Sequence, residues 1–307
     1  MCKNVEGYAV LSAVERKIEQ FIIELKDKEV SALYAKLPHG KRLRAKLIIK
    51  IAGHSLAAIK TAAIVEMIHA ASLLHDDVID EAYTRRSKPS LNALYGNKTA
   101  IMLGDILYSK GFLELNNISS EISKMVSGAV VQLSLGELKD VSLSETFNTN
   151  KENYLEMIYQ KTASLMEACA GSAAILAGKD KKVYMTYGKN LGIAFQMIDD
   201  LLDITMDTET LGKPSLHDFK EGKTTLPYIY LYEVLESEDA QKLKSLHKKS
   251  LSQEEETWIK EKMKEKKIIE KSYQEAKQLI EEAIFLMNEK GEKELSSIAM
   301  AMIERNF

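Results

Sequence analysis

The distribution of proline constrains the fold of this chain more than any other feature of its sequence. Its 307 residues include only four prolines, at positions 38, 89, 214 and 227. Proline breaks a helix interior because it lacks an N–H donor and its ring clashes with the preceding turn. The long intervals between the prolines are rich in Ala, Leu, Glu, Lys and Met, which favour helices. Because alternating, strand-like runs are hard to find, the sequence predicts an all-α fold.

Hydrophobic periodicity places long helices along most of the chain. Residues 11–25 carry an amphipathic stripe, and residues 59–81 are apolar nearly all round until an acidic end, as expected of a central, buried helix. Since no linker or repeat is visible, the simplest organisation is a single domain over residues 1–307. Further helices are predicted over residues 97–115, 122–138, 153–176, 183–205, 228–235 and 254–306, with a long polar loop over residues 206–227.

Composition and charge disfavour several classes of protein. The formal net charge of −3 argues against a nucleic-acid surface, which would normally be basic. The two cysteines, Cys2 and Cys169, indicate neither a disulfide framework nor a metal knuckle and fit a reducing cytoplasm. The first residues lack the pattern of a signal peptide, and no stretch reaches the ~18 apolar residues of a membrane span. We therefore expect a cytoplasmic protein that binds no nucleic acid.

Two clusters of aspartate share the spacing D-D-x-x-D, and each ends an apolar helix. Residues three or four apart lie on one helix face, so the acids of each cluster are neighbours and repel one another. Carboxylate oxygens are natural ligands of Mg²⁺, which usually binds through one or two carboxylates plus substrate phosphates. Histidine and cysteine are not at soft-metal spacing, which disfavours zinc. The clusters comprise Asp76, Asp77 and Asp80, and Asp199, Asp200 and Asp203.

The basic residues indicate a polyanionic ligand. Lys41, Arg42 and Arg44 open one predicted helix, and Arg85 and Arg86 follow the first acid cluster. Lys161, Lys213 and Lys223 stand singly further along the chain. Acids for a metal together with scattered Lys and Arg describe a site for phosphates. The sequence has no G-x-x-x-x-G-K-[ST] loop and no nucleophile elbow, so it predicts neither a P-loop NTPase nor an acyl transferase.

With these motifs the chain resembles the trans-type isoprenyl diphosphate synthases, the polyprenyl synthetase family. The motifs follow in the family's order: HGKRLRA (39–45), EMIHAASLLHDDVIDEAYTRRSKPS (66–90), GDILYS (104–109), QKTASL (160–165), FQMIDDLLD (195–203) and GKPSLHDFKEGKTTLP (212–227). Two departures are His39-Gly40, where the family has a glycine pair, and Ala45, where proline is common. Neither removes a charged ligand.

The resemblance implies a fold, a metal and a set of ligands. The fold is a bundle of long antiparallel helices around a central cavity, with the aspartate clusters across its mouth. Mg²⁺ would be held by Asp76, Asp80 and Asp199, and the six aspartates with Lys161 and Lys213 would be catalytic. The residues implied to support an allylic diphosphate are Arg85, Lys161, Thr162, Gln196, Lys213 and Lys223. Those implied to hold isopentenyl diphosphate are Lys41, Arg44, His69 and Arg86.

The implied reaction condenses isopentenyl diphosphate head-to-tail onto an allylic diphosphate, by ionisation, attack and loss of a proton. Ala71 and Ser72 are small, at positions where bulky aromatics would stop chain growth early. They imply an open tunnel and a long, octaprenyl-type product for quinone side chains, with farnesyl diphosphate as the expected primer. Alternatively, these two residues only allow close helix packing, and the enzyme makes farnesyl or geranylgeranyl diphosphate.

Other classes of protein remain as alternatives. A terpene cyclase usually carries a second motif of Asn/Asp, Ser/Thr and Glu, whereas here D-D-x-x-D occurs again. A non-catalytic partner subunit would be expected to have lost acids or basic ligands. A ferritin-like metal bundle needs several Glu-x-x-His pairs, and residues 66–69 supply only one. The resemblance also implies a homodimer, and a lipid product suggests transient membrane contact at its release.

Overall fold

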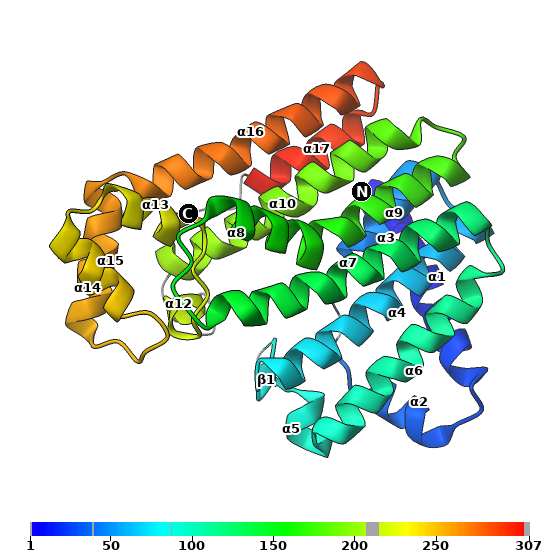
Figure 1. Ribbon diagram of the computed structural model, residues 1–307. Coiled ribbons are helices and arrows are strands. Elements are labelled where there is room, and N and C mark those ends of the chain that lie inside the picture. The colour runs from blue at the N-terminus through cyan, green and yellow to red at the C-terminus, as the bar shows by residue number, and fades with distance from the viewer. Residues whose placement is uncertain (1, 39, 87, 207–214, 304–307) are drawn as a thin grey trace. The chain divides into compact units, whose positions relative to one another are not determined.

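The computed structural model describes residues 2–38, 40–86, 88–206 and 215–303 and is almost entirely helical (Figure 1). The predicted all-α class is confirmed. The chain divides into two compact units, Met1–Val130 with Ala168–Met185, and Val131–Glu167 with Thr186–Phe307. The boundaries fall within helices rather than in linkers. The single domain over residues 1–307 stays a prediction.

The first unit is organised around α4, whose residues are buried along most of its length. α4 contacts α1, α3 and α6, and α6 runs beside it in Figure 1. Gly104 of α6 permits this approach, because a Cβ there would lie 2.3 Å from His75 Nε2. The elements are α1 (Cys2–Ile23), α2 (Lys28–Tyr34), α3 (Leu43–Ala52), α4 (Leu56–Ile79), β1 (Thr84–Arg85), β2 (Lys88–Pro89), α5 (Leu91–Tyr95) and α6 (Asn97–Leu115).

Helix α4 is long and apolar enough to cross a membrane by length and composition alone. Within its unit it is a core helix, since 61% of its most apolar window is buried. Ser55 caps its first turn by accepting from Ala58 N at 3.1 Å. Its last turn ends at Asp80, and Glu81 takes a left-handed conformation (φ 50°) that turns the chain away. The acids of the first cluster therefore lie at a helix end.

Three helices contribute residues to both units: α7 (Ser120–Ser144), α9 (Ser164–Leu176) and α10 (Lys181–Thr205). In the second unit α16 packs on α13, α15 and α17 through a buried stripe that includes Ala276, Ile280 and Met287. The other elements are α8 (Lys151–Ile158), η1 (Tyr159–Ala163), α12 (His217–Lys220), α13 (Leu226–Val234), α14 (Ser237–Ser245), α15 (Gln253–Glu265), α16 (Ile268–Glu289) and α17 (Lys293–Ile303).

The sequence predicted the long helices more closely than the short ones. Residues 97–115 coincide with α6, and residues 183–205 lie within two residues of α10. The single helix predicted over residues 153–176 is interrupted by the π-helical turn η1, whereas the further helices predicted over residues 254–306 are α15, α16 and α17. The predicted loop over residues 206–227 contains α12 and the start of α13, and its residues 207–214 lie outside the described part. The elements α2, α5, α14 and the hairpin were not predicted.

Candidate active site

The three acids of the first cluster differ in their exposure to solvent. Asp76 is half-exposed and Asp80 is exposed, whereas Asp77 is buried, with 3% of its surface accessible. A buried carboxylate needs a partner, and Arg85 supplies one, with Nε 2.7 Å and Nη2 2.5 Å from Asp77 Oδ1. The first cluster thus combines one buried acid, which Arg85 holds, with two acids that solvent can reach.

The segment that follows α4 explains how Arg85 reaches Asp77. The hairpin pairs Thr84 with Pro89 and Arg85 with Lys88, which turns the chain back on itself. The amide of Asn92 donates to the carbonyls of Asp77 and Ala82, each at 3.1 Å. These bonds satisfy carbonyls at the helix end. The hairpin and α5 therefore hold the end of α4 that carries the acids.

A group of cations surrounds His69 in the same unit. Burial lowers the pKa of His69 well below its usual range, and nearby guanidinium groups lower it further. In order of effect these belong to Arg44, Arg86, Arg85 and Arg42. Nδ1 of His69 and Nε of Arg44 are buried and have no hydrogen-bond partner among the described residues. An unpaired, buried guanidinium N–H of Arg44 beside several other cations favours binding of an anion.

Two arginines of this group have different local roles. Arg86 donates from Nη1 to Pro38 O at 3.0 Å, and a Cβ at Gly40 would lie 3.0 Å from the same nitrogen, so glycine there leaves room for the guanidinium. Arg42 instead binds Glu15 at 2.6 Å and the buried Glu66 at 3.3 Å. Arg42 is therefore a structural cation, while Lys41 is exposed on the loop before α3.

Ala71 and Ser72, the residues predicted to set product length, are both buried on α4. The Ser72 hydroxyl donates to the carbonyl of His69 in its own helix, at 2.9 Å. Their small size therefore permits close packing in this structure. Their effect on product length stays a prediction.

The second cluster repeats the division into accessible and buried acids. Asp199 is half-exposed, whereas Asp200 and Asp203 are buried. Asp203 accepts from the backbone N–H of Asp218 at 3.2 Å. Burial raises the pKa of Asp200 to about 8 and the Asp218 carboxylate adds to the rise, while hydrogen bonds from Tyr154 and Gln196 oppose it. Tyr154 was not predicted as a site residue.

Lys161 and Thr162, both predicted to bind an allylic diphosphate, lie in a π-helical turn, η1, between α8 and α9. Single π-helical turns occur often at functional sites. Two glycines allow neighbouring helices to approach this turn closely. A Cβ at Gly136 of α7 would lie 2.3 Å from Lys161 N, and one at Gly192 of α10 would lie 2.5 Å from Ala163 Cα. Backbone contacts therefore fix the turn from two sides.

The ammonium of Lys161 lies between two buried acids of α7. Its Nζ is 2.6 Å from Asp140 Oδ2 and 2.8 Å from Glu137 Oε2. These acids were not predicted as site residues, although their i,i+3 spacing in GELKD places them on one helix face. They hold a cation that the sequence assigned to a diphosphate.

Thr162 and Gln196 were predicted to bind the same diphosphate, and the structure brings them together. Thr162 Oγ1 donates to Gln196 Oε1 at 3.0 Å. Lys223 Nζ lies 3.1 Å from Glu221 Oε2. Burial raises the pKa of Glu221, but His217 and Lys223 outweigh it, and the pKa falls to about 2. Lys213 lies outside the described residues.

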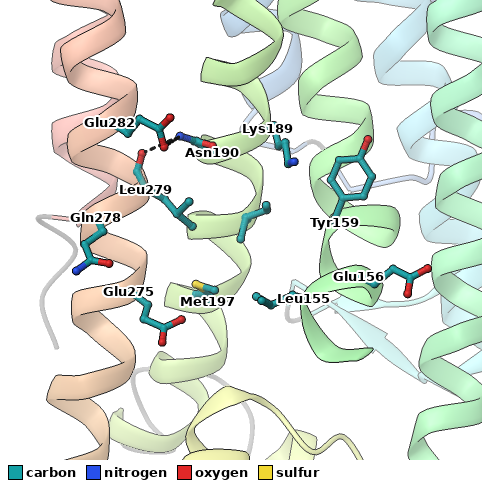
Figure 2. A pocket seen from close by; sticks show the side chains of 11 residues that line it. Leu155, Glu156, Tyr159, Lys189, Asn190, Met197, Glu275, Gln278, Leu279 and Glu282 are labelled. Carbon is teal, nitrogen blue, oxygen red and sulfur yellow. Dashed lines mark hydrogen bonds between the residues drawn. The ribbon is translucent and has the colours of Figure 1, made fainter. Parts of the chain in front are cut away.

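A pocket of about 610 Å³ lies beside these segments in the second unit, between α8 with η1, α10 and α16 (Figure 2). Its apolar lining includes Leu155, Met197 and Leu279. Three glutamates and a single lysine also line it, so it is poorly suited to a diphosphate. Of the predicted site residues that the structure describes, none lines this pocket.

The accessible acids are the residues that could hold a divalent metal ion. Asp76, Asp80 and Asp199 offer hard carboxylate oxygens, which fit Mg²⁺. Within the described part of the chain, no group of three or more His, Cys, Asp or Glu side chains is gathered so as to hold a metal ion. The metal-binding role of these three aspartates stays a prediction.

Comparison with known proteins adds independent findings. A sequence model of the polyprenyl synthetase family matches residues 28–265. Octaprenyl diphosphate synthase of Escherichia coli is 39% identical over 214 residues, which span 67% of this chain and 66% of that enzyme. The structure of octaprenyl pyrophosphate synthase from Helicobacter pylori matches with a TM-score of 0.93 and 44% identity, covering 97% of this chain and 99% of that one. A decaprenyl diphosphate synthase structure from Rhodobacter capsulatus matches at a TM-score of 0.90 and 26% identity, covering 97% and 96%.

Proposed function

We propose that this protein is a prenyltransferase that condenses isopentenyl diphosphate head-to-tail onto an allylic diphosphate. The chain belongs to the polyprenyl synthetase family, and the proposal starts from that membership. The observation that carries the proposal is the pair of D-D-x-x-D motifs, each of which presents an accessible acid at or near a helix end. Basic residues accompany both motifs, as the two diphosphates require. A terpene cyclase would not need the second group of cations around His69.

The proposed reaction begins when the C–O bond of the allylic diphosphate breaks and leaves an allylic carbocation. Mg²⁺ bound by Asp76, Asp80 and Asp199 would supply positive charge to the leaving diphosphate. The Lys161 ammonium, which Glu137 and Asp140 hold in place, adds to that stabilisation. Thr162 and Gln196 bind the same diphosphate.

The second substrate is isopentenyl diphosphate, and its double bond attacks the carbocation. We assign its diphosphate to Lys41, Arg44, His69 and Arg86. The buried, unpartnered nitrogens of Arg44 and His69 support this assignment, because an anion would satisfy them. The condensed cation then loses a proton, with the departed diphosphate as the base.

We further propose a long, octaprenyl-type product built on farnesyl diphosphate. Ala71 and Ser72 are small, and Ser72 lies one turn below Asp76 on α4. The similar enzymes from Escherichia coli and Helicobacter pylori are named for octaprenyl products. A role in making quinone side chains is part of this proposal. Cytoplasmic location and transient membrane contact during product release remain proposals carried by the sequence.

The experiment that tests the function incubates purified protein with farnesyl diphosphate, labelled isopentenyl diphosphate and Mg²⁺. The products are dephosphorylated and separated by chain length. A series that ends near octaprenyl supports both the reaction and the long product. A series that ends at geranylgeranyl keeps the reaction and rejects the long product. If no condensation product forms at any Mg²⁺ concentration, the proposed function is rejected.

The proposed enzyme acts as a homodimer, and exposed apolar side chains on α7 support this assembly. Val131, Leu135 and Leu138 follow one another about a turn apart and are 58%, 46% and 65% exposed. A stripe of this kind on one helix face fits an interface between copies of the chain. Sedimentation equilibrium measures the mass directly, and Leu138→Glu is expected to shift it to that of a monomer. A monomeric wild-type protein would reject the assembly.

A further inference from the structure

Tyr154 of α8 is a buried tyrosine that contacts the second aspartate cluster. It is 1% exposed, and its hydroxyl donates to Asp200 Oδ2 at 2.6 Å. The other oxygen of Asp200 accepts from Gln196 Nε2 at 2.9 Å. Both oxygens of this buried carboxylate therefore bind protein donors. Asp200 is buried, whereas its neighbour Asp199 is half-exposed.

The hydrogen bonds at Asp200 determine how the side chains of Gln196 and Thr162 are oriented. Because Gln196 turns its amide nitrogen to Asp200, its carbonyl oxygen faces the other way. That oxygen accepts from Thr162 Oγ1 at 3.0 Å. The chain of hydrogen bonds from Tyr154 to Thr162 thus joins α8, α10 and η1. The side-chain amide of Gln196 has one accepting and one donating end. A change at Asp200 therefore affects every hydrogen bond in this series.

We propose that Tyr154 is a positioning residue for the allylic diphosphate: through Asp200 it sets the orientation of Gln196 and Thr162. This inference rests on the proposed function, which places those two side chains against the diphosphate. Tyr154 itself is buried and acts through Asp200 rather than on the substrate. Without the hydroxyl, Asp200 Oδ2 loses its donor, the carboxylate can rotate, and the amide of Gln196 loses its fixed partner.

The test is Tyr154→Phe, which removes the hydroxyl and keeps the ring that fills the core. Tyr187→Phe is the matched control, because Tyr187 is also buried and its hydroxyl donates to Leu295 O at 2.8 Å. Both variants lose one buried hydrogen bond, so both melting temperatures are expected to fall by a similar amount. Only Tyr154→Phe is expected to lower kcat/KM for farnesyl diphosphate, by about tenfold, the effect of one lost buried hydrogen bond.

The two substrates provide the readout that a purely structural role would not change. The KM for isopentenyl diphosphate is expected to stay at the wild-type value in Tyr154→Phe. Thr162→Val should lower kcat/KM for farnesyl diphosphate little further in the Tyr154→Phe background, because the two residues act through the same series of hydrogen bonds. Equal loss for both substrates, or unchanged kinetics for farnesyl diphosphate, would overturn the positioning role. An inactive wild-type protein would overturn the proposed function instead.

Discussion

The substitution Gly136→Ala adds a single methyl group and directly tests whether the packing of α7 fixes the position of η1. Gly136 lies on α7 where that helix meets the π-helical turn, and no side chain separates the two backbones. A Cβ built on Gly136 would lie 2.3 Å from Lys161 N and 2.8 Å from the carbonyl carbon of Gln160. Real Cβ contacts are essentially never shorter than 3.0 Å. Gly136→Ala must therefore displace backbone, and the displaced residue is Lys161.

The expected size of the effect follows from this geometry. Overpacking costs about 1–3 kcal/mol, and the higher helix propensity of alanine offsets up to about 1 kcal/mol. Because backbone cannot move aside as a flexible side chain can, we expect the free energy of unfolding to fall by about 2 kcal/mol. Relief of the contact requires a shift of about 1 Å at Lys161, and such misplacement of a catalytic group costs about 10²-fold in turnover.

Thermal unfolding followed by circular dichroism, together with the rate of isopentenyl incorporation, measures both effects. Gly128→Ala is the matched control: it makes the same change on α7, at a position where a Cβ meets no atom within 4 Å. That variant is expected to be as active as the wild type and more stable by up to about 1 kcal/mol. If Gly136→Ala behaved like Gly128→Ala in both assays, the close contact between α7 and η1 would not position Lys161.

Three further predictions concern the acids and the product. Asp76→Ala or Asp199→Ala should lower the rate of isopentenyl incorporation by orders of magnitude and leave the helical circular dichroism unchanged; near-normal rates would refute the metal assignment. Ala71→Phe should shorten the products in the chain-length assay, and an unchanged length would place the end of the tunnel elsewhere. Glu221 has its pKa lowered from 4.5 to about 2, so its stabilising contribution is present above pH 4.5 and is lost as pH falls towards 2. Glu221→Gln should therefore lose less stability than the wild type over that interval, as measured by melting temperature.

The fold was predictable where local sequence decides structure. Segments without proline that repeat apolar residues at the helical period predicted the extents of α6 and α10 closely. The turn η1 was not predictable, since its residues YQKTA have no local signal that separates them from the flanking helices. Its position depends on the contacts at Gly136 and Gly192, which are distant in sequence. Such tertiary contacts override the local preference for a continuous helix.

The identity of the acids was predictable from their spacing, but their different environments were not. A D-D-x-x-D motif places its acids on one helix face, yet only tertiary structure determines which carboxylate is buried. In both clusters the second aspartate is buried and held by protein donors: Asp77 binds Arg85, and Asp200 binds Tyr154 and Gln196. A buried carboxylate that protein donors hold resists rotation and fixes the helical turn on which its neighbour lies. Each doublet therefore combines an anchoring acid with an accessible one, and Asp76 and Asp199 are the accessible members. Substitution of the anchoring acids should thus disturb both stability and activity, whereas substitution of Asp76 or Asp199 should lower activity far more than stability.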